Sequence, residues 1–183
     1  MTRLQGGGTR GFVATAMGHD YYGVELRQEE VDRIIKQQQK LGYVFSISCD
    51  DSQTHNPSRK FNFCYSCPPY YNLEVYSKLT NDLSAKKTFS EFMDGMCLVL
   101  KNCFDCLEND SLCVMVVGNF RNKDGNLVHF NGSLVNAARK VGFKLHDELI
   151  FWGASKCASQ RCGQFEANRK SVRVHEYILI FRK

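Results

Sequence analysis

Short apolar runs alternate along the chain with segments whose apolar residues recur every three or four positions. Runs of the length of a buried strand occupy residues 21–26, 43–48, 61–65 and 111–117. The spacing of a helix with one buried face occupies residues 12–17, 28–41, 89–107 and 134–141. Gly18, Gly42 and Gly142 follow three of these segments, where a glycine commonly ends a helix. Alternating strands and helices predict an α/β fold with a mostly parallel sheet.

Two further apolar runs, residues 145–152 and 175–181, close the chain. Only a basic segment, Arg161 to Arg173, separates them, and it shows no helical pattern. We therefore expect these last two strands to pair antiparallel as a hairpin. The whole pattern predicts a three-layer sheet, mostly parallel, that ends in this hairpin.

Length and composition suggest one domain spanning residues 1–183. Hydrophobic residues make up 43% and charged residues 23%, as in ordinary globular proteins. No apolar run approaches the roughly 20 residues of a membrane span, and no signal-peptide core follows the N-terminus. We expect a cytoplasmic protein, free of membranes and associated with the nucleoid or with the cytoplasm of a phage-infected host. The net charge of +5 permits a nucleic-acid partner.

Nine cysteines at irregular spacing argue against a disulfide framework. Cys103 and Cys106 form a CxxC pair, with Cys157 and Cys162 later in the chain. A zinc site is conceivable, but Cys103 occupies an apolar position of a predicted helix. We therefore predict no metal.

A glycine-rich loop stands before the first predicted helix: Gly6, Gly7, Gly8, Thr9, Arg10 and Gly11. Glycines allow close backbone approach, and a helix N-terminus presents free N–H groups to a ligand. Glu25, followed by Leu26, ends the next strand, where a Rossmann-like fold holds ribose hydroxyls. The alternative for Glu25 is a solvated charge or a helix N-cap, and the glycine loop before it favours the ribose role. Asp50 and Asp51 follow the third strand and either accept a hydrogen bond from a purine amino group or simply begin a loop.

The strand at residues 61–65 ends abruptly in Ser66, Cys67, Pro68, Pro69 and Tyr70. Two consecutive prolines continue neither strand nor helix, so the ring and carbonyls of this turn stand at the carboxyl edge of the sheet. Open α/β sheets bind ligands at that edge. The alternative is an ordinary exit from a strand into a loop.

Taken together, these motifs resemble the class I methyltransferases that use S-adenosylmethionine. More narrowly, the chain resembles the exocyclic-amino DNA methyltransferases, and among them the small phage-type adenine enzymes, from about Gly6 to Phe181. The resemblance implies a Rossmann-like sheet, with S-adenosylmethionine held by the glycine loop, Glu25, Leu26, Asp50 and Asp51. It also implies that a base rotates out of DNA, stacks on Tyr70, and gives its amino protons to acceptors around Cys67 and Pro68.

Two departures qualify this resemblance. Most of the wider family has Asp, Asn or Ser where this chain has Cys67, and a thiol is a weak acceptor. Either Ser66, Asp82 or another loop group then supplies the polarity, or activity is low. Only five residues, none acidic, precede the glycine loop, so the family's first strand is expected to be short or missing.

These departures keep other functions open. The first is a catalytically weak or inactive subunit that binds nucleic acid, a second copy or a sister protein. A nicotinamide-dependent oxidoreductase would share the glycine loop and Glu25 but has no use for the proline turn. Cys67 as a nucleophile in ring-carbon cytosine methylation is disfavoured by the tyrosine after the prolines.

Contacts to DNA are expected from two segments, because the chain has no room for a separate target-recognition domain. Residues 71–85 are polar and irregular and are interpreted as a mobile substrate loop. The basic segment is the better candidate for phosphate contacts, although it also fits a solvated hairpin loop. The predicted contacts are Tyr71, Asn72, Glu74, Tyr76, Arg161, Phe165, Arg169, Lys170 and Arg173.

Overall fold

The computed structural model describes residues 1–4, 6–153 and 163–183. Its first elements are α1 (Thr9–Ala16), β1 (Tyr22–Glu25), α2 (Gln28–Leu41), β2 (Ser46–Cys49), β3 (Phe61–Ser66), η1 (Tyr71–Leu73) and η2 (Leu83–Ala85). The remaining elements are α3 (Phe89–Cys106), β4 (Leu107–Val117), β5 (Phe120–Arg121), β6 (Leu127–Val128), α4 (Phe130–Lys140), β7 (Lys144–Trp152), α5 (Gly163–Asn168) and β8 (His175–Arg182). Strands and helices alternate as the sequence predicts.

The strands form two main groups. β1 pairs with β2 in parallel, and the second group has the order β3-β4-β8-β7. β3 runs parallel to β4, while β8 lies antiparallel between β4 and β7. The expected antiparallel pairing of the last two strands is therefore confirmed, and the sheet is mixed.

Residues 1–4 join these two groups of strands. The Thr2 N–H donates to the Tyr22 carbonyl at 2.9 Å, and the Val24 N–H donates to the Thr2 carbonyl at 3.0 Å. On the other side, the Tyr65 N–H donates to the Met1 carbonyl at 3.0 Å. The expected first strand is thus short but present, and the lateral order becomes β2, β1, residues 1–4, β3, β4, β8, β7.

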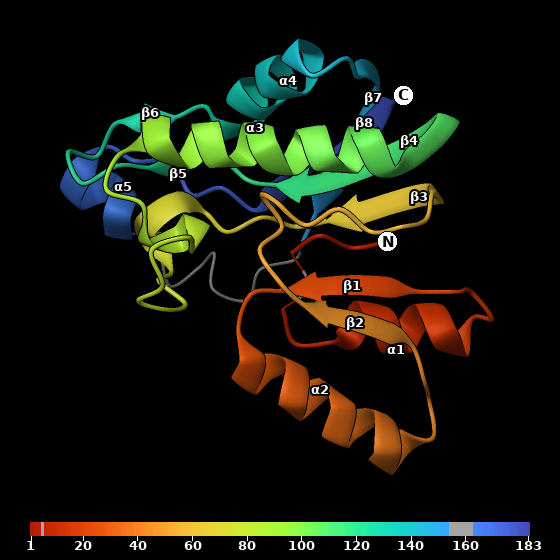
Figure 1. Cartoon of the computed structure of the whole chain (residues 1–183). Coiled ribbons are helices and arrows are strands. Elements are labelled where there is room, and N and C mark those ends of the chain that lie inside the picture. The colour runs from red at the N-terminus through yellow and green to blue at the C-terminus, as the bar shows by residue number, and fades with distance from the viewer. Residues whose placement is uncertain (5, 154–162) are drawn as a thin grey trace.

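Helices lie on both sides of the sheet. α3 and α4 cover one face of the four-stranded group, whereas α1 and α2 lie beside β1 and β2 on the opposite side (Figure 1). The main core lies under α3 and α4 and includes Phe92, Met96, Leu134 and Phe181. A smaller core of Tyr21, Ile34 and Phe45 holds α1 and α2.

Local signals set the ends of the longer helices. α2 ends at Leu41 and is capped by Gly42, whose φ of 71° favours glycine. α3 begins in a capping box, in which the Glu91 N–H donates to the Thr88 hydroxyl and the Glu91 carboxylate accepts from the Thr88 N–H. These signals place both helices within one residue of the predicted ranges. No helix in the described ranges is long and apolar enough to cross a membrane.

Several segments differ from expectation. The basic segment was predicted to have no helix, and that prediction is wrong, because α5 lies within it. A helix of six residues is too short to show an apolar period. β4 begins at Leu107 instead of residue 111, and β2 begins at Ser46 instead of residue 43. The polar segment 71–85 contains the turns η1 and η2.

Candidate functional site

A cavity of about 440 Å³ opens at the carboxyl ends of β1 and β3 and of the short first strand. This volume falls within the range of small-molecule sites. Its lining brings together segments that are far apart in the sequence. The lining residues are Arg3, Leu4, Gly6, Gly7, Arg10, Val24, Glu25, Leu26, Arg27, Asp51, Ser52, Cys67, Pro68, Pro69, Tyr70, Glu74, Tyr76, Asn81, Asp82 and Leu83.

The glycine loop contributes only part of its residues to the cavity. Gly6, Gly7 and Arg10 line it, whereas Thr9 is exposed in the first turn of α1. Gly11 serves packing instead, because an added Cβ would lie 2.4 Å from the Phe45 ring. Gly8 adopts a left-handed φ of 84° at the N-cap of α1. The loop therefore combines a surface for a ligand with close packing of its helix.

Glu25 is buried beside this loop. Its Oε2 accepts from the Gly6 N–H at 2.9 Å. Its Oε1 accepts from the Arg27 N–H at 3.1 Å and from Arg27 Nε at 3.3 Å. A carboxylate offers about four acceptor positions, so one remains for a further donor in the cavity once the donors in the described part of the chain are counted. The structure thus places Glu25 and Leu26 next to the glycine loop, as the sequence analysis expects.

The two aspartates after β2 diverge. Asp51 lines the cavity and accepts from Asn81 Nδ2 at 3.0 Å. Asp50 does not line it. Its Oδ2 lies 2.7 Å from His55 Nδ1, and this hydrogen bond holds the pKa of Asp50 below its usual value. Of the two predicted cofactor contacts, only Asp51 faces this site.

The proline turn forms the opposite wall of the cavity. Cys67, Pro68, Pro69 and Tyr70 all line it. Ser66 is fully buried, and its Oγ accepts from the Leu4 N–H at 3.3 Å. Ser66 therefore ties the turn to the segment that leads into the glycine loop.

Tyr70 is held by residues that sequence reasoning missed. Its hydroxyl donates to the Glu176 carboxylate of β8. Gly118 lies beside the ring, and an added Cβ there would meet it at 3.4 Å, an ordinary van der Waals contact. Burial, together with Glu176, raises the pKa of Tyr70, so the phenol stays protonated at neutral pH. The available signal for Glu176 was an acidic residue at the start of an apolar strand.

Cys67 is a neutral thiol in this setting. Burial raises its pKa above the usual range, Glu176 raises it further, and Arg10 opposes the shift. A nucleophilic cysteine needs the thiolate form. The site therefore does not favour attack by Cys67 on a ring carbon.

Asp82 adds a polar group to the same wall. It lines the cavity and is buried. Its Oδ2 accepts from the Ser77 hydroxyl at 2.7 Å, and its Oδ1 accepts from the Ser84 N–H at 2.8 Å. Asp82 thereby caps η2 and fixes the segment that borders the cavity.

The predicted DNA contacts in residues 71–76 occupy different environments. The Tyr71 ring is partly buried and packs against the main core, with its centroid 5.9 and 5.8 Å from those of Phe89 and Phe92. Tyr76 is 49% exposed, and its hydroxyl donates to Glu74. Burial of part of the side chain, together with this hydrogen bond, raises the pKa of Tyr76 to about 12. The side chain of Asn72 lies outside the described part of the structure.

The basic segment contributes a group of cations near the β5–β6 turn. An added Cβ at Gly125 would lie 2.8 Å from Lys170 Nζ. Burial and the charge of Arg121 lower the pKa of Arg173, so those two cations are close enough for their charges to interact. Sequence reasoning missed Arg121. Arg169 and Phe165 are exposed, and Arg161 lies outside the described residues.

Comparison with known proteins shows similarity in fold. No family model matches the chain, and no curated protein matches it in sequence. It is similar to a candidate DNA modification methylase of Thermus thermophilus, at 18% identity and a TM-score of 0.53, over 73% of this chain and 50% of that one. It is also similar to an S-adenosylmethionine-dependent methyltransferase of Clostridium acetobutylicum, at 10% identity and a TM-score of 0.62, over 97% of this chain and 80% of that one.

A TehB-like S-adenosylmethionine-dependent methyltransferase of Corynebacterium glutamicum is similar at 16% identity and a TM-score of 0.57, over 97% of this chain and 76% of that one. The chain spans half the length of the Thermus protein. At these identities the similarity establishes a shared open α/β fold. The function has to be argued from the site.

Proposed function

We propose that this protein transfers a methyl group from S-adenosylmethionine to an exocyclic amino group of a DNA base, adenine N6. The observation that carries the proposal is that the Cys67–Tyr70 turn opens into the same cavity as Gly6, Gly7 and Glu25. A methyl donor and an amino acceptor have to meet in one such space. The fold shared with S-adenosylmethionine-dependent methyltransferases supports a Rossmann-like cofactor site, and the Thermus similarity favours DNA.

The residues around the glycine loop fit S-adenosylmethionine. Gly6 and Gly7 present backbone without side chains, and Glu25 keeps one acceptor position for a ribose hydroxyl. Asp51, held by Asn81, supplies a carboxylate for the adenine amino group. When bound, S-adenosylmethionine supplies an electrophilic methyl on a sulfonium. The residues of this chain then have only to position the acceptor.

The proline turn is suited to that task. The amino nitrogen of adenine is a poor nucleophile because its lone pair is delocalised into the ring. The Pro68 carbonyl accepts one amino proton, and the Asp82 carboxylate supplies the polarity that a thiol at Cys67 gives only weakly. Tyr70 offers its ring for stacking, since Glu176 holds its hydroxyl. Hydrogen bonds that strengthen as charge develops on nitrogen then lower the barrier.

A group of cations near the β5–β6 turn fits the charge of the DNA backbone. Arg121, Lys170 and Arg173 gather beside the β5–β6 turn and the start of β8, close in the chain to Glu176. Arg169 and Phe165 add an exposed charge and ring. We assign phosphate contacts to these residues, with Glu74 and Tyr76 bordering the cavity on the other side. The protein would then be a single domain, 1–183, that acts alone or as a homodimer and recognises its DNA sequence through short loops.

One observation favours a second candidate function. Cys67 is a neutral thiol where a stronger acceptor is usual in this kind of enzyme. A subunit with weak or no activity, which binds nucleic acid or a partner protein, would tolerate such a residue. Restoring the acceptor separates the two functions, because Cys67→Asp or Cys67→Asn would raise the activity of a weak enzyme and leave a purely binding subunit inactive.

The first experiment is a calorimetric titration of the folded protein with S-adenosylmethionine, followed by mass spectrometry of nucleosides from DNA incubated with both. We expect one bound cofactor per chain and N6-methyladenine in the digest. A folded sample without cofactor binding contradicts the enzyme proposal. Methylation of RNA or free nucleotide alone would contradict the DNA assignment.

Tyr70 gives the sharper test of the site. Stacking of a base on an aromatic ring contributes about 1–3 kcal/mol, so Tyr70→Ala should lower kcat/KM for DNA by about 5- to 150-fold. Tyr70→Phe keeps the ring and should retain most of this stacking. Cofactor affinity serves as the control and should change little in Tyr70→Phe. Equal kcat/KM in wild type and Tyr70→Ala would disprove the stacking role.

A further inference from the structure

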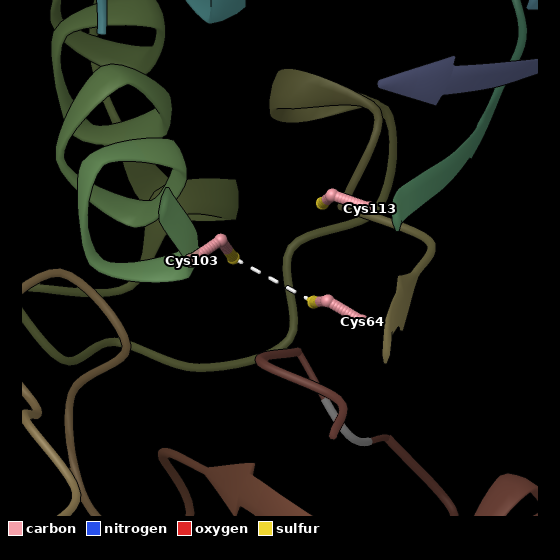
Figure 2. Close-up of side chains that lie close together, drawn as sticks. All are labelled: Cys64, Cys103 and Cys113. Carbon is pink, nitrogen blue, oxygen red and sulfur yellow. Dashed lines mark hydrogen bonds between the residues drawn. The ribbon is translucent and has the colours of Figure 1, made fainter. Parts of the chain in front are cut away.

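Three cysteines from separate elements meet in the main core. Cys64 of β3, Cys103 of α3 and Cys113 of β4 are each fully buried (Figure 2). Their sulfur atoms lie within 4.8 Å of one another, and the Cys64 and Cys103 sulfurs are 3.7 Å apart. In Figure 2 the side chains of Cys64 and Cys103 point toward each other, with Cys113 beside them. Such a grouping of thiols offers three sulfur ligands to one point.

The spacing fits a metal ion bound by three thiolates. A metal–sulfur bond of about 2.3 Å places three sulfurs around a trigonal ion at the corners of a triangle with sides of about 4.0 Å. No fourth histidine, cysteine or acidic residue joins this group within the described residues. Zinc in structural sites almost always takes four ligands, whereas thiolates select soft ions such as Cu(I). Three ligands therefore favour Cu(I).

A buried cation supports the same conclusion. Arg3 is fully buried and forms no ion pair with a carboxylate in the described part of the chain. Its Nε has no hydrogen-bond partner among the described residues. Its other two nitrogens donate to neutral acceptors, the carbonyls of His55 and Asn102 at 2.6 and 3.1 Å and the Cys106 sulfur at 2.9 Å, one helical turn from Cys103. An uncompensated buried charge is costly, and an anionic thiolate centre nearby would offset it.

We propose that Cys64, Cys103 and Cys113 bind one Cu(I) ion as a three-coordinate thiolate site. On binding, each thiol gives up its proton to solvent and forms one sulfur–copper bond, and copper keeps its oxidation state. The ion joins β3, α3 and β4, and Cys64 stands two residues before Ser66, at the base of the proline turn. The site would therefore brace the strand that presents that turn. It does not depend on the proposed methyl transfer.

The test uses the full chain, refolded anaerobically with Cu(I) buffered by bicinchoninate. We expect one tightly held ion per chain, with X-ray absorption giving three sulfur neighbours at about 2.3 Å. Cys113→Ala and Cys103→Ala should lose this ion. Cys97→Ala, on the same helix but outside the cluster, is the matched control and should retain it. No stoichiometric binding, or binding that survives Cys113→Ala, would overturn the proposal.

A stability measurement covers the case in which an alanine variant folds poorly. Cu(I) at about 100 times its Kd should raise the Tm of the wild-type chain by about 5–10 °C. Cys113→Val keeps nearly the same volume in the core and removes the ligand, so its Tm should not respond to Cu(I). An equal rise in this variant would show that copper binds elsewhere, and three reduced thiols that pack as apolar residues would then account for the cluster.

Discussion

The position of Glu25 allows a quantitative prediction about cofactor binding. Three of about four acceptor positions on its carboxylate are used, one by Gly6 and two by Arg27. The remaining position can accept one hydrogen bond from a ribose hydroxyl. Such a bond to a charged acceptor contributes about 1.5–3 kcal/mol. Glu25→Gln removes the charge and one acceptor oxygen, so the Kd for S-adenosylmethionine should rise about 10- to 150-fold.

Asp50→Asn is the matched control for this measurement. Both substitutions change an acid to its amide at the end of neighbouring parallel strands, β1 and β2. Asp50 lies outside the cavity and binds His55, so its amide variant should leave the Kd within twofold of wild type. Isothermal titration calorimetry gives both Kd values, and thermal unfolding confirms that each variant is folded.

Two results would refute the reasoning. An unchanged Kd in folded Glu25→Gln means that the ribose does not meet this carboxylate. Equal weakening in Glu25→Gln and Asp50→Asn means that general negative charge near the cavity, instead of the geometry of Glu25, governs affinity. Glu25→Asp distinguishes charge from geometry, because it keeps the carboxylate but moves it back by one methylene group. The Kd should rise in this variant if the position of the carboxylate matters.

Three other predictions follow from single contacts. Lys170→Gln should reduce the slope of log K against log salt concentration for DNA binding by about 0.9. The control is Arg182→Gln, which should not change the slope, because Arg182 lies at the far end of β8 and pairs with Asp110 of β4. The hydrogen bond from His55 lowers the pKa of Asp50, so its ionised carboxylate contributes stability that is fully present above pH 3.8 and is lost as the pH falls below that value. The urea midpoints of wild type and Asp50→Asn should therefore converge as the pH is lowered below 3.8. Gly11→Ala should lower Tm by about 2–12 °C, as overpacking of about 1–3 kcal/mol implies, while Gly163→Ala, with open space around it, should not.

The sequence predicted most elements because their signals are local. The capping box at Thr88 fixes the start of α3, and Gly42 fixes the end of α2. Each signal consists of residues that are neighbours in the sequence. α5 escaped prediction because six residues carry no measurable period. The short first strand was hard to recognise because its evidence lies in pairing with β1 and β3, about 20 and 60 residues away.

The sequence predicted the motifs that form the candidate site, but it did not predict which individual residues contact one another there. The glycine loop, Glu25 and the proline turn do meet around one cavity. The sequence did not distinguish Asp51 from Asp50, because both follow the end of β2 at Cys49, where the chain bends, and the direction of a bend is not contained in the local pattern. It also paired Cys103 with Cys106 by spacing, whereas the fold groups Cys103 with Cys64 and Cys113. Such groupings depend on sheet register, which no local pattern contains.

The short first strand also determines how the molecule would open. Few backbone hydrogen bonds connect residues 1–4 to β1 and β3, so this seam is a natural boundary between two cooperative units. The amide protons of Val24 and Tyr65 should therefore exchange with solvent together, ahead of those within β4 and β8. A ligand anchored at Gly6, two residues beyond the seam, would slow both exchange rates at once. A ligand bound in the cavity would thus stabilise the association of the two groups of strands.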